Sequence, residues 1–294
     1  MVRYLKTYLR YIKKQLRPKK ETLLYLIGNY EIIIPSNHTL PAFQKKHKLY
    51  DRFLPILAKC LDEGEIIIDI GANVGDSTVA MLSESNNNIL CIEPSDKYFS
   101  FLEKNIGNLP ESKRKLVRCL KTFVGNNINP GSLKHHGGTA FFDGNSNGQV
   151  NFQKLDQICK AEEVNISLIK SDTDGFDYDA LLSAKEIISK SMPILYWENQ
   201  IENLTQKDGF DQLYELLSVN NYTHIYVFDN FGNLMLENIE FKTLSSLNSY
   251  IFSMLNISNT RTIYYTDILA FAHKDHFRVT KVIEKYKTEW INQK

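Results

Sequence analysis

The sequence predicts an α/β fold built on a mostly parallel sheet. Short runs of apolar residues recur along the chain, amphipathic stretches separate them, and a glycine-rich turn follows the first run of the main series. Strands that alternate with helices pair in parallel through right-handed crossovers, which gives a doubly wound sheet with helices on both faces. We expect strands at 66–70, 89–92, within 116–124, and at 166–170, 194–197, 224–228 and 263–272.

The stretches between these strands have helical periodicity. We expect helices at 50–61, from 76 to about 82, at 95–106, 176–189 and 210–219. No clear helix separates the last two strands, so one of them is expected to run antiparallel, at or near an edge of the sheet.

The first 49 residues are expected to form a small extension to the main domain, which we place at 50–294. Apolar residues between Val2 and Leu16 recur every three or four positions, and residues 1–20 carry eight basic residues and no acid. Two interpretations stay open: a helix that rests on an anionic membrane or a partner, or a helix packed on the main domain with a solvated basic face. A strand is expected at 30–35, within the lead-in to the main domain.

Composition excludes several classes of protein. The net charge of +1 gives no field that would attract nucleic acid, and no run approaches the roughly 20 apolar residues of a membrane span. The N-terminus is too charged for a secretory signal. The four cysteines are scattered without metal-finger spacing, which fits buried thiols in a reducing cytoplasm.

The strongest motif is Asp69-Ile-Gly71-Ala-Asn73-Val-Gly75, which follows an apolar strand and opens a helix. Glycine permits close approach of the backbone, and Asn tolerates a left-handed turn. The free N–H groups at a helix N-terminus suit an anionic ligand. The alternative interpretation is a tight turn without a ligand. The spacing differs from the Gly-x-Gly-x-x-Gly of nicotinamide-binding turns.

Glu93 ends the next strand, 18 residues after Gly75. An acid at that place accepts the ribose hydroxyls of a bound nucleoside. The glycine turn and this acid together predict a nucleoside site more specifically than either feature alone.

These residues resemble the FkbM-type family of S-adenosylmethionine-dependent methyltransferases. The likeness covers roughly residues 62–200. Its blocks are the turn 68–75 with Glu93-Pro94, then Leu155-Asp156 before a short helix, then 168–177, and then Pro193 with a strand that ends in Glu198. Asp174 and Asp177 stand where the family more often has glutamate.

The resemblance implies the Rossmann-like class I methyltransferase fold, with a seven-stranded sheet, and S-adenosylmethionine as cofactor. It also implies O-methylation of a saccharide, glycoconjugate or secondary-metabolite hydroxyl. We expect the cofactor to be bound by Asp69, Gly71, Asn73, Gly75, Glu93 and Asp174.

Three acids follow one strand closely: Asp172, Asp174 and Asp177. Asp172 ends the strand and is our first choice for an active-site acid, while Asp177 is predicted to contact the substrate. Capping of the next helix is the alternative for Asp174 and Asp177. Calcium-loop spacing is absent, so no metal site is predicted, although a divalent cation among these acids stays open.

The segment 125–151 is rich in glycine and asparagine and is expected to form a lid over the substrate. His135 and His136 within it are candidates for the general base, because histidine titrates near neutrality. Two loop histidines without a role are the alternative. Glu198 is predicted to contact the substrate, with a buried strand end as the alternative.

The sequence thus predicts a cytoplasmic O-methyltransferase of polysaccharide or secondary-metabolite biosynthesis. Its partner is a small-molecule or glycan acceptor, with peripheral contact to the inner face of the membrane through residues 1–20 left open. Two other functions stay open: an NAD-dependent oxidoreductase on a similar sheet, and a non-catalytic S-adenosylmethionine-binding module in a glycan-assembly complex.

Overall fold

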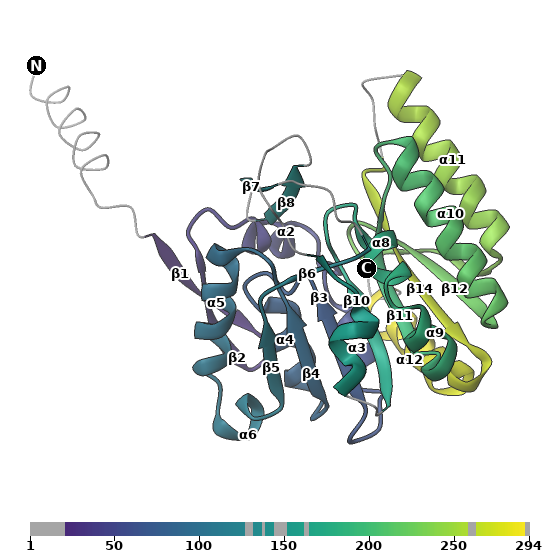
Figure 1. Ribbon diagram of the computed structural model, residues 1–294. Helices are drawn as coiled ribbons and strands as arrows, with labels where there is room; N and C mark the ends of the chain where they lie inside the picture. Colours follow the sequence, from purple (N-terminus) through teal and green to yellow (C-terminus); the bar gives the residue numbers. More distant parts are fainter. Residues whose placement is uncertain are drawn as a thin grey trace, which may run out of the picture.

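The central sheet lies between two layers of helices (Figure 1). The computed structural model describes residues 21–126, 132–136, 139–143, 152–161, 165–257 and 263–291; for 132–136, 139–143, 161 and 256–257 it describes the backbone alone. The sheet order is β13-β12-β14-β11-β10-β3-β4-β5. Its strands are β3 (Ile66–Ile70), β4 (Asn88–Ile92), β5 (Val117–Leu120), β10 (Ile166–Ser171), β11 (Ile194–Gln200), β12 (Tyr222–Asp229), β13 (Leu234–Ile239) and β14 (Tyr265–Ala272).

Alternate side chains along the strands pack into two hydrophobic cores, one on each face of the sheet. Ile67 belongs to the core under one face, and its neighbour Ile68 belongs to the other. The first core is covered by α3 (Phe53–Ala58), α4 (Asp76–Glu84), α5 (Asp96–Gly107) and α12 (His276–Tyr286). The second is covered by α7 (Leu155–Ile158), α8 (Asp177–Leu182), α9 (Lys185–Ser191), α10 (Leu204–Val219) and α11 (Phe241–Ile257).

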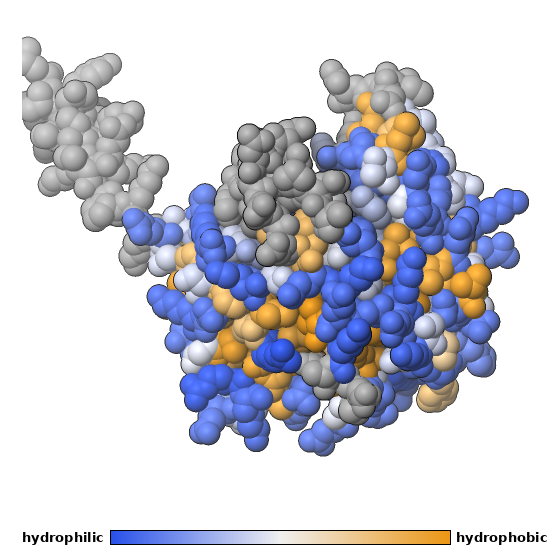
Figure 2. All heavy atoms as spheres, in the orientation of Figure 1, coloured by the Kyte–Doolittle hydropathy of each residue, from blue (hydrophilic) through white to orange (hydrophobic). Residues whose placement is uncertain are grey.

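The remaining elements are short. They are the helices α2 (Leu40–Lys46) and α6 (Glu111–Arg114), the helical turns η1 (Cys159–Ala161), η2 (His273–Asp275) and η3 (Lys287–Ile291), and the strands β6 (Phe123–Val124) and β9 (Phe152–Gln153). Hydrophilic residues cover most of the face in Figure 2, and hydrophobic residues show mainly between them.

The α/β class and the mostly parallel Rossmann-like sheet are confirmed: four of the neighbouring strand pairs are parallel and three are antiparallel. The sheet has eight strands in the described part of the chain instead of seven, because β13 adds a hairpin to β12. Of the last two predicted strands, β14 runs antiparallel, and it lies between β11 and β12; β13 is antiparallel to β12 as well. Helix α11 before β14 was not predicted. The single helix predicted at 176–189 is in fact two helices, α8 and α9, on either side of residues 183–184.

The lead-in segment is part of the main body. It forms a hairpin of β1 (Thr22–Ile27) and β2 (Tyr30–Pro35), and Ile32 and Ile34 are fully buried in the first core. The side chain of Asn105 on α5 accepts from the Ile33 N–H at 2.7 Å and donates to the Ile33 carbonyl at 2.9 Å. These contacts fix the lead-in beside the end of the sheet that carries the predicted site.

The basic helix predicted at 2–17 lies outside the described residues. Within the residues that are described, no helix is both long enough and apolar enough to cross a bilayer.

Candidate functional site

A cavity of about 1060 Å³ lies where the parallel strands end. Its floor includes residues at the carboxyl ends of β3, β4, β10 and β11, the usual ligand side of such a sheet. The lead-in supplies the opposite wall with α2 and residues 47–52, and Asn230 and Trp290 also line the cavity. The lead-in therefore completes a pocket that the sheet alone would leave open.

The turn after β3 uses left-handed backbone at three positions. Gly71 has φ +72°, Asn73 has φ +48° and Gly75 has φ +88°. A side chain at Gly71 would collide with the Asp172 carbonyl oxygen, so glycine is required there by contact between β3 and β10. At Gly75 the crowding atoms belong to Leu102 on α5. Gly71 and Asn73 line the cavity, whereas Gly75 shapes the turn from behind.

Glu93 holds this turn to the end of β4. One carboxylate oxygen accepts from the Asn73 N–H at 2.9 Å, and the other accepts from the Ser95 N–H at 2.8 Å. Burial raises the pKa of Glu93 to about 7, against the opposing effect of the two N–H donors. Carboxylate oxygens have further lone pairs, so the side chain can still accept hydroxyl donors from the cavity that it lines.

Asp69 lies beneath the turn and does not line the cavity. Its carboxylate is fully buried and accepts from the Ser77 and Thr78 hydroxyls at 2.8 and 2.6 Å. Lys170 Nζ lies 3.0 Å from its other oxygen and also donates to the Gly71 carbonyl at 3.0 Å. Although burial alone would lower it, the pKa of Lys170 is raised by Asp69 and Asp172. The predicted cofactor contact of Asp69 has no support in this geometry; the residue positions the turn.

The three acids after β10 separate into two kinds. The Asp172 side chain is 51% exposed and lines the cavity, 3.7 Å from Lys170 Nζ. Asp174, with φ +51°, also lines the cavity. Asp177 is fully buried, and its carboxylate accepts from the Ser171 hydroxyl at 2.6 Å and the Thr173 N–H at 3.1 Å. The substrate contact predicted for Asp177 is therefore unsupported, because its carboxylate closes the turn into α8.

The two candidate histidines fall in a hairpin of β7 (Ser132–His136) and β8 (Thr139–Asp143). The side chains of His135 and His136 lie outside the described residues, as does most of the predicted lid 125–151. Their role as base stays a prediction.

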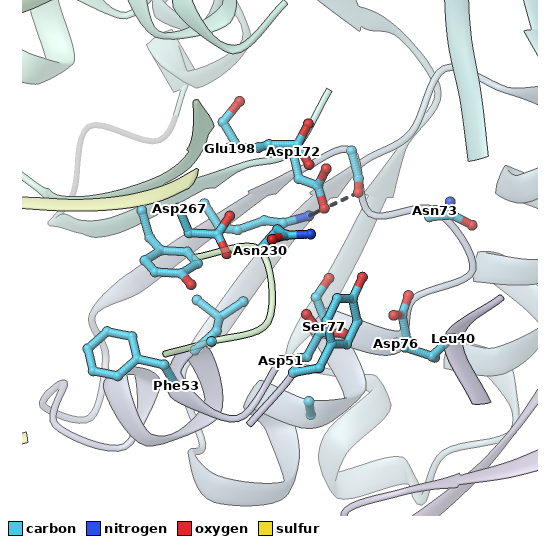
Figure 3. A pocket seen from close by; sticks show the side chains of 18 of the residues that line it. Leu40, Asp51, Phe53, Asn73, Asp76, Ser77, Asp172, Glu198, Asn230 and Asp267 are labelled. Atoms are coloured by element: carbon cyan, nitrogen blue, oxygen red, sulfur yellow. Dashed lines mark hydrogen bonds and ion pairs between the residues drawn. The ribbon is translucent and has the colours of Figure 1, made fainter. Parts of the chain in front are cut away.

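The cavity contains acids that the sequence analysis missed. Asp51, Asp76 and Asp267 line it together with the predicted Glu198 (Figure 3). Desolvation within the cavity raises the pKa values of Asp76 and Asp267, and desolvation together with the charges of Asp76 and Asp172 raises that of Asp51. Asp51 and Asp267 lie far from the motif in sequence, and no local pattern marked them. Asp76 opens the predicted helix directly after Gly75, and that position was the one available signal.

No metal centre is evident in the part of the chain that is described. No group of three or more His, Cys, Asp or Glu side chains there is arranged to hold a metal ion. The divalent cation left open by the sequence gains no support.

Comparison with known proteins decides the family. The model of the methyltransferase FkbM domain matches residues 69–225, more than half of the chain. The chain belongs to this family. It is therefore a methyltransferase, and its cofactor is S-adenosylmethionine.

Solved structures with a similar fold include three methyltransferases. A methyltransferase FkbM from Methylobacillus flagellatus is 14% identical, with 79% of this chain and 59% of that chain covered and a TM-score of 0.40. An O-methyltransferase from Bacillus cereus in complex with SAH is 15% identical, with 90% of this chain and 96% of that chain covered and a TM-score of 0.42. A SAM-dependent methyltransferase from Agrobacterium tumefaciens is 10% identical, with 87% of this chain and 72% of that chain covered and a TM-score of 0.45. No curated protein matches.

The residues that line the cavity fit S-adenosylmethionine. Glu93 suits the ribose hydroxyls, and the turn 71–75 leads into the N-terminus of α4, which suits the methionine carboxylate. The surrounding acids favour a ligand with an ammonium and a sulfonium group.

Proposed function

We propose that this methyltransferase of the FkbM family methylates a hydroxyl oxygen of a saccharide, a glycoconjugate or a secondary metabolite. The observation that carries the proposal is the position of Asp172. Its carboxylate is half exposed at the centre of the cavity, between the cofactor turn on β3 and the acids of β11 and β14.

S-adenosylmethionine, when bound, supplies a methyl group activated by a positively charged sulfur. The residues of this chain must hold the acceptor hydroxyl in line with that methyl group and remove the proton of the hydroxyl. A carboxylate of Asp172 within reach of the hydroxyl accepts that proton. Lys170, 3.7 Å from Asp172 and anchored on Asp69, fixes where the carboxylate stands.

Gly71, Asn73, Glu93 and Asp174 are assigned to the cofactor side of the cavity, and Glu198 is assigned to the acceptor side. Asp69 and Gly75 support the cofactor turn from behind. Either His135 or His136 is the alternative base, and the hairpin that carries them is the part of the predicted lid for which a backbone is described.

The two other functions are less well supported. The family match places the chain among methyltransferases, which argues against a nicotinamide-dependent oxidoreductase. A non-catalytic module would be favoured by an Asp172 turned into the core, but Asp172 faces an open cavity.

We also propose a cytoplasmic location, with peripheral contact to the membrane through residues 1–20. In support, all four cysteines are free thiols, including Cys91 and Cys119, which are partners on neighbouring strands. A liposome flotation assay of the chain with and without residues 1–20 tests the membrane contact. Flotation that does not change on their removal would contradict it.

The test of O-methylation uses S-adenosylmethionine labelled with ¹³C in the methyl group and a panel of hexoses, hexosamines and their methyl glycosides. We expect a methyl signal on oxygen in at least one product. Asp172→Asn should lower turnover by about 10²-fold or more while S-adenosylhomocysteine binding is retained. Methyl groups only on nitrogen or carbon would refute O-methylation. Full turnover by Asp172→Asn would refute the role of Asp172 as the base and leave His135 or His136 in that role.

A further inference from the structure

Three carboxylates form a row across neighbouring strands at the acceptor end of the cavity. Glu198 on β11 and Asp267 on β14 are direct partners in the antiparallel register. Ser171 on β10 pairs with Trp197, so Asp172, one residue on, stands beside Glu198. Residues at the same level of adjacent strands point to the same face, and all three line the cavity (Figure 3).

Glu198 is the buried member of this row. Glu198 is only 9% exposed, and its Oε1 atom is buried with no hydrogen-bond partner. The four charged side chains that act on it most strongly are all acids, namely Asp172, Asp174, Asp177 and Asp267. Asp267 receives a hydrogen bond from the Tyr196 hydroxyl, and the charges that act on it most strongly are those of Asp172 and Asp51.

Like charges placed opposite each other on a sheet are unfavourable, and a buried acid without a cation holds its proton instead of ionising. Burial accordingly raises the pKa values of Glu198 and Asp267 well above the usual range. Lys170 lies 3.0 Å from Asp69 and 3.7 Å from Asp172, so it neutralises only that end of the row. In the described part of the chain, no cation is among the charges that act most strongly on Glu198 and Asp267. A cation that enters the cavity beside these two acids would therefore let them release their protons and ionise.

We propose that the acceptor is an amino sugar and that Glu198 and Asp267 bind its protonated amino group beside the hydroxyl presented to Asp172. This inference rests on the proposed function and names the substrate class of the same site. An ammonium group donates three hydrogen bonds, which suits the unpartnered Glu198 oxygen and the facing Asp267 carboxylate.

The Glu198–Asp267 pair lies apart from the residues assigned to the cofactor. In the sheet order, β4 and β3, which carry Glu93 and Gly71, lie on one side of β10, and β11 and β14 lie on the other. The Glu198–Asp267 pair thus stands on the side away from the nucleoside. A metal ion is a poorer occupant, because these acids do not converge into a metal-binding group within the described residues.

The test measures binding of matched sugars by calorimetry to the full chain saturated with S-adenosylhomocysteine. The probes are glucosamine, N-acetylglucosamine and glucose, the same set in the galactose series, and magnesium chloride alone. We expect the amines to bind on the order of tenfold more tightly than their acetylated and neutral counterparts. Glu198→Gln and Asp267→Asn should abolish this preference, and Glu186→Gln, on the exposed face of α9, should retain it.

Binding of S-adenosylhomocysteine reports separately on folding and on the cofactor site. If it binds and the amines are not preferred, or if no sugar binds, the amine inference fails and the proposed methyl transfer stands. Weaker S-adenosylhomocysteine binding by Glu198→Gln would assign the row to the cofactor and overturn the inference. Magnesium binding that Glu198→Gln abolishes would assign the row to a metal ion and would overturn the inference as well. If wild-type protein does not bind S-adenosylhomocysteine at all, the proposed function itself fails.

Discussion

Lys170 links the stability of the fold to the geometry of the site, because it pairs with the buried Asp69 and donates to the backbone of the cofactor turn. Its side chain is 7% exposed, and its Nζ atom lies 3.0 Å from the fully buried Asp69 carboxylate. The same nitrogen donates to the carbonyls of Ile70 and Gly71. Lys170→Met keeps an unbranched apolar side chain as far as Cε and removes the ammonium group. Asp69 then keeps its two hydroxyl donors but loses its cation.

Breaking a buried ion pair by removing one partner costs about 3–5 kcal/mol, because the other charge stays buried and uncompensated. With a urea dependence of about 2 kcal/mol per M, the unfolding midpoint should fall by about 2 M. The assay is urea unfolding followed by tryptophan fluorescence. Lys207→Met, which breaks the i,i+4 pair with Asp211 on the surface of α10, is the control and should cost at most about 1 kcal/mol. A loss in Lys170→Met no larger than in this control would refute the reasoning.

Two further predictions concern the cofactor turn. Gly71→Ala should destabilise the fold by about 1–3 kcal/mol from backbone strain alone and more from its collision with the Asp172 backbone, and it should weaken S-adenosylhomocysteine binding. Gly64→Ala, at φ +90° with nothing within 4 Å, is the matched control and should show the strain alone; equal losses in urea unfolding would count against the collision. The second prediction concerns pH. Glu93 has a folded pKa of about 7 against an unfolded value of 4.5, so the folded state binds more protons between these values and the unfolding free energy falls as pH rises through that window. Urea titrations of the ligand-free protein from pH 4.5 to 8 should show a loss of roughly 3 kcal/mol from Glu93. A fall that is equally steep in Glu93→Gln would contradict this assignment.

The parallel part of the fold followed from local sequence patterns. Apolar strands such as 66–70 and 166–170, separated by amphipathic helices, predicted the order of elements because each pattern reflects burial of one face. The strands β1 and β13 and the helix α11 were missed. They lie outside the regular alternation of strand and helix, and their formation depends on contacts distant in sequence.

The site was predictable where its residues belong to one turn. The motif 69–75 and Glu93 were found because the β-α-β spacing itself brings them together. Side-chain direction could not be predicted: Asp177 was expected to contact the substrate, yet its carboxylate is turned inward and accepts hydrogen bonds from Ser171 and Thr173. Asp51 and Asp267 reach the cavity from opposite ends of the chain, and only the tertiary fold places them there.

The central claim is tested most directly by calorimetric titration with S-adenosylmethionine, S-adenosylhomocysteine and NADH. The account predicts that both methionine nucleosides bind, that NADH does not, and that Glu93→Ala weakens their binding by about tenfold or more through loss of the ribose contacts. Binding of NADH alone would contradict the account, and so would unchanged nucleoside affinity in a well-folded Glu93→Ala protein.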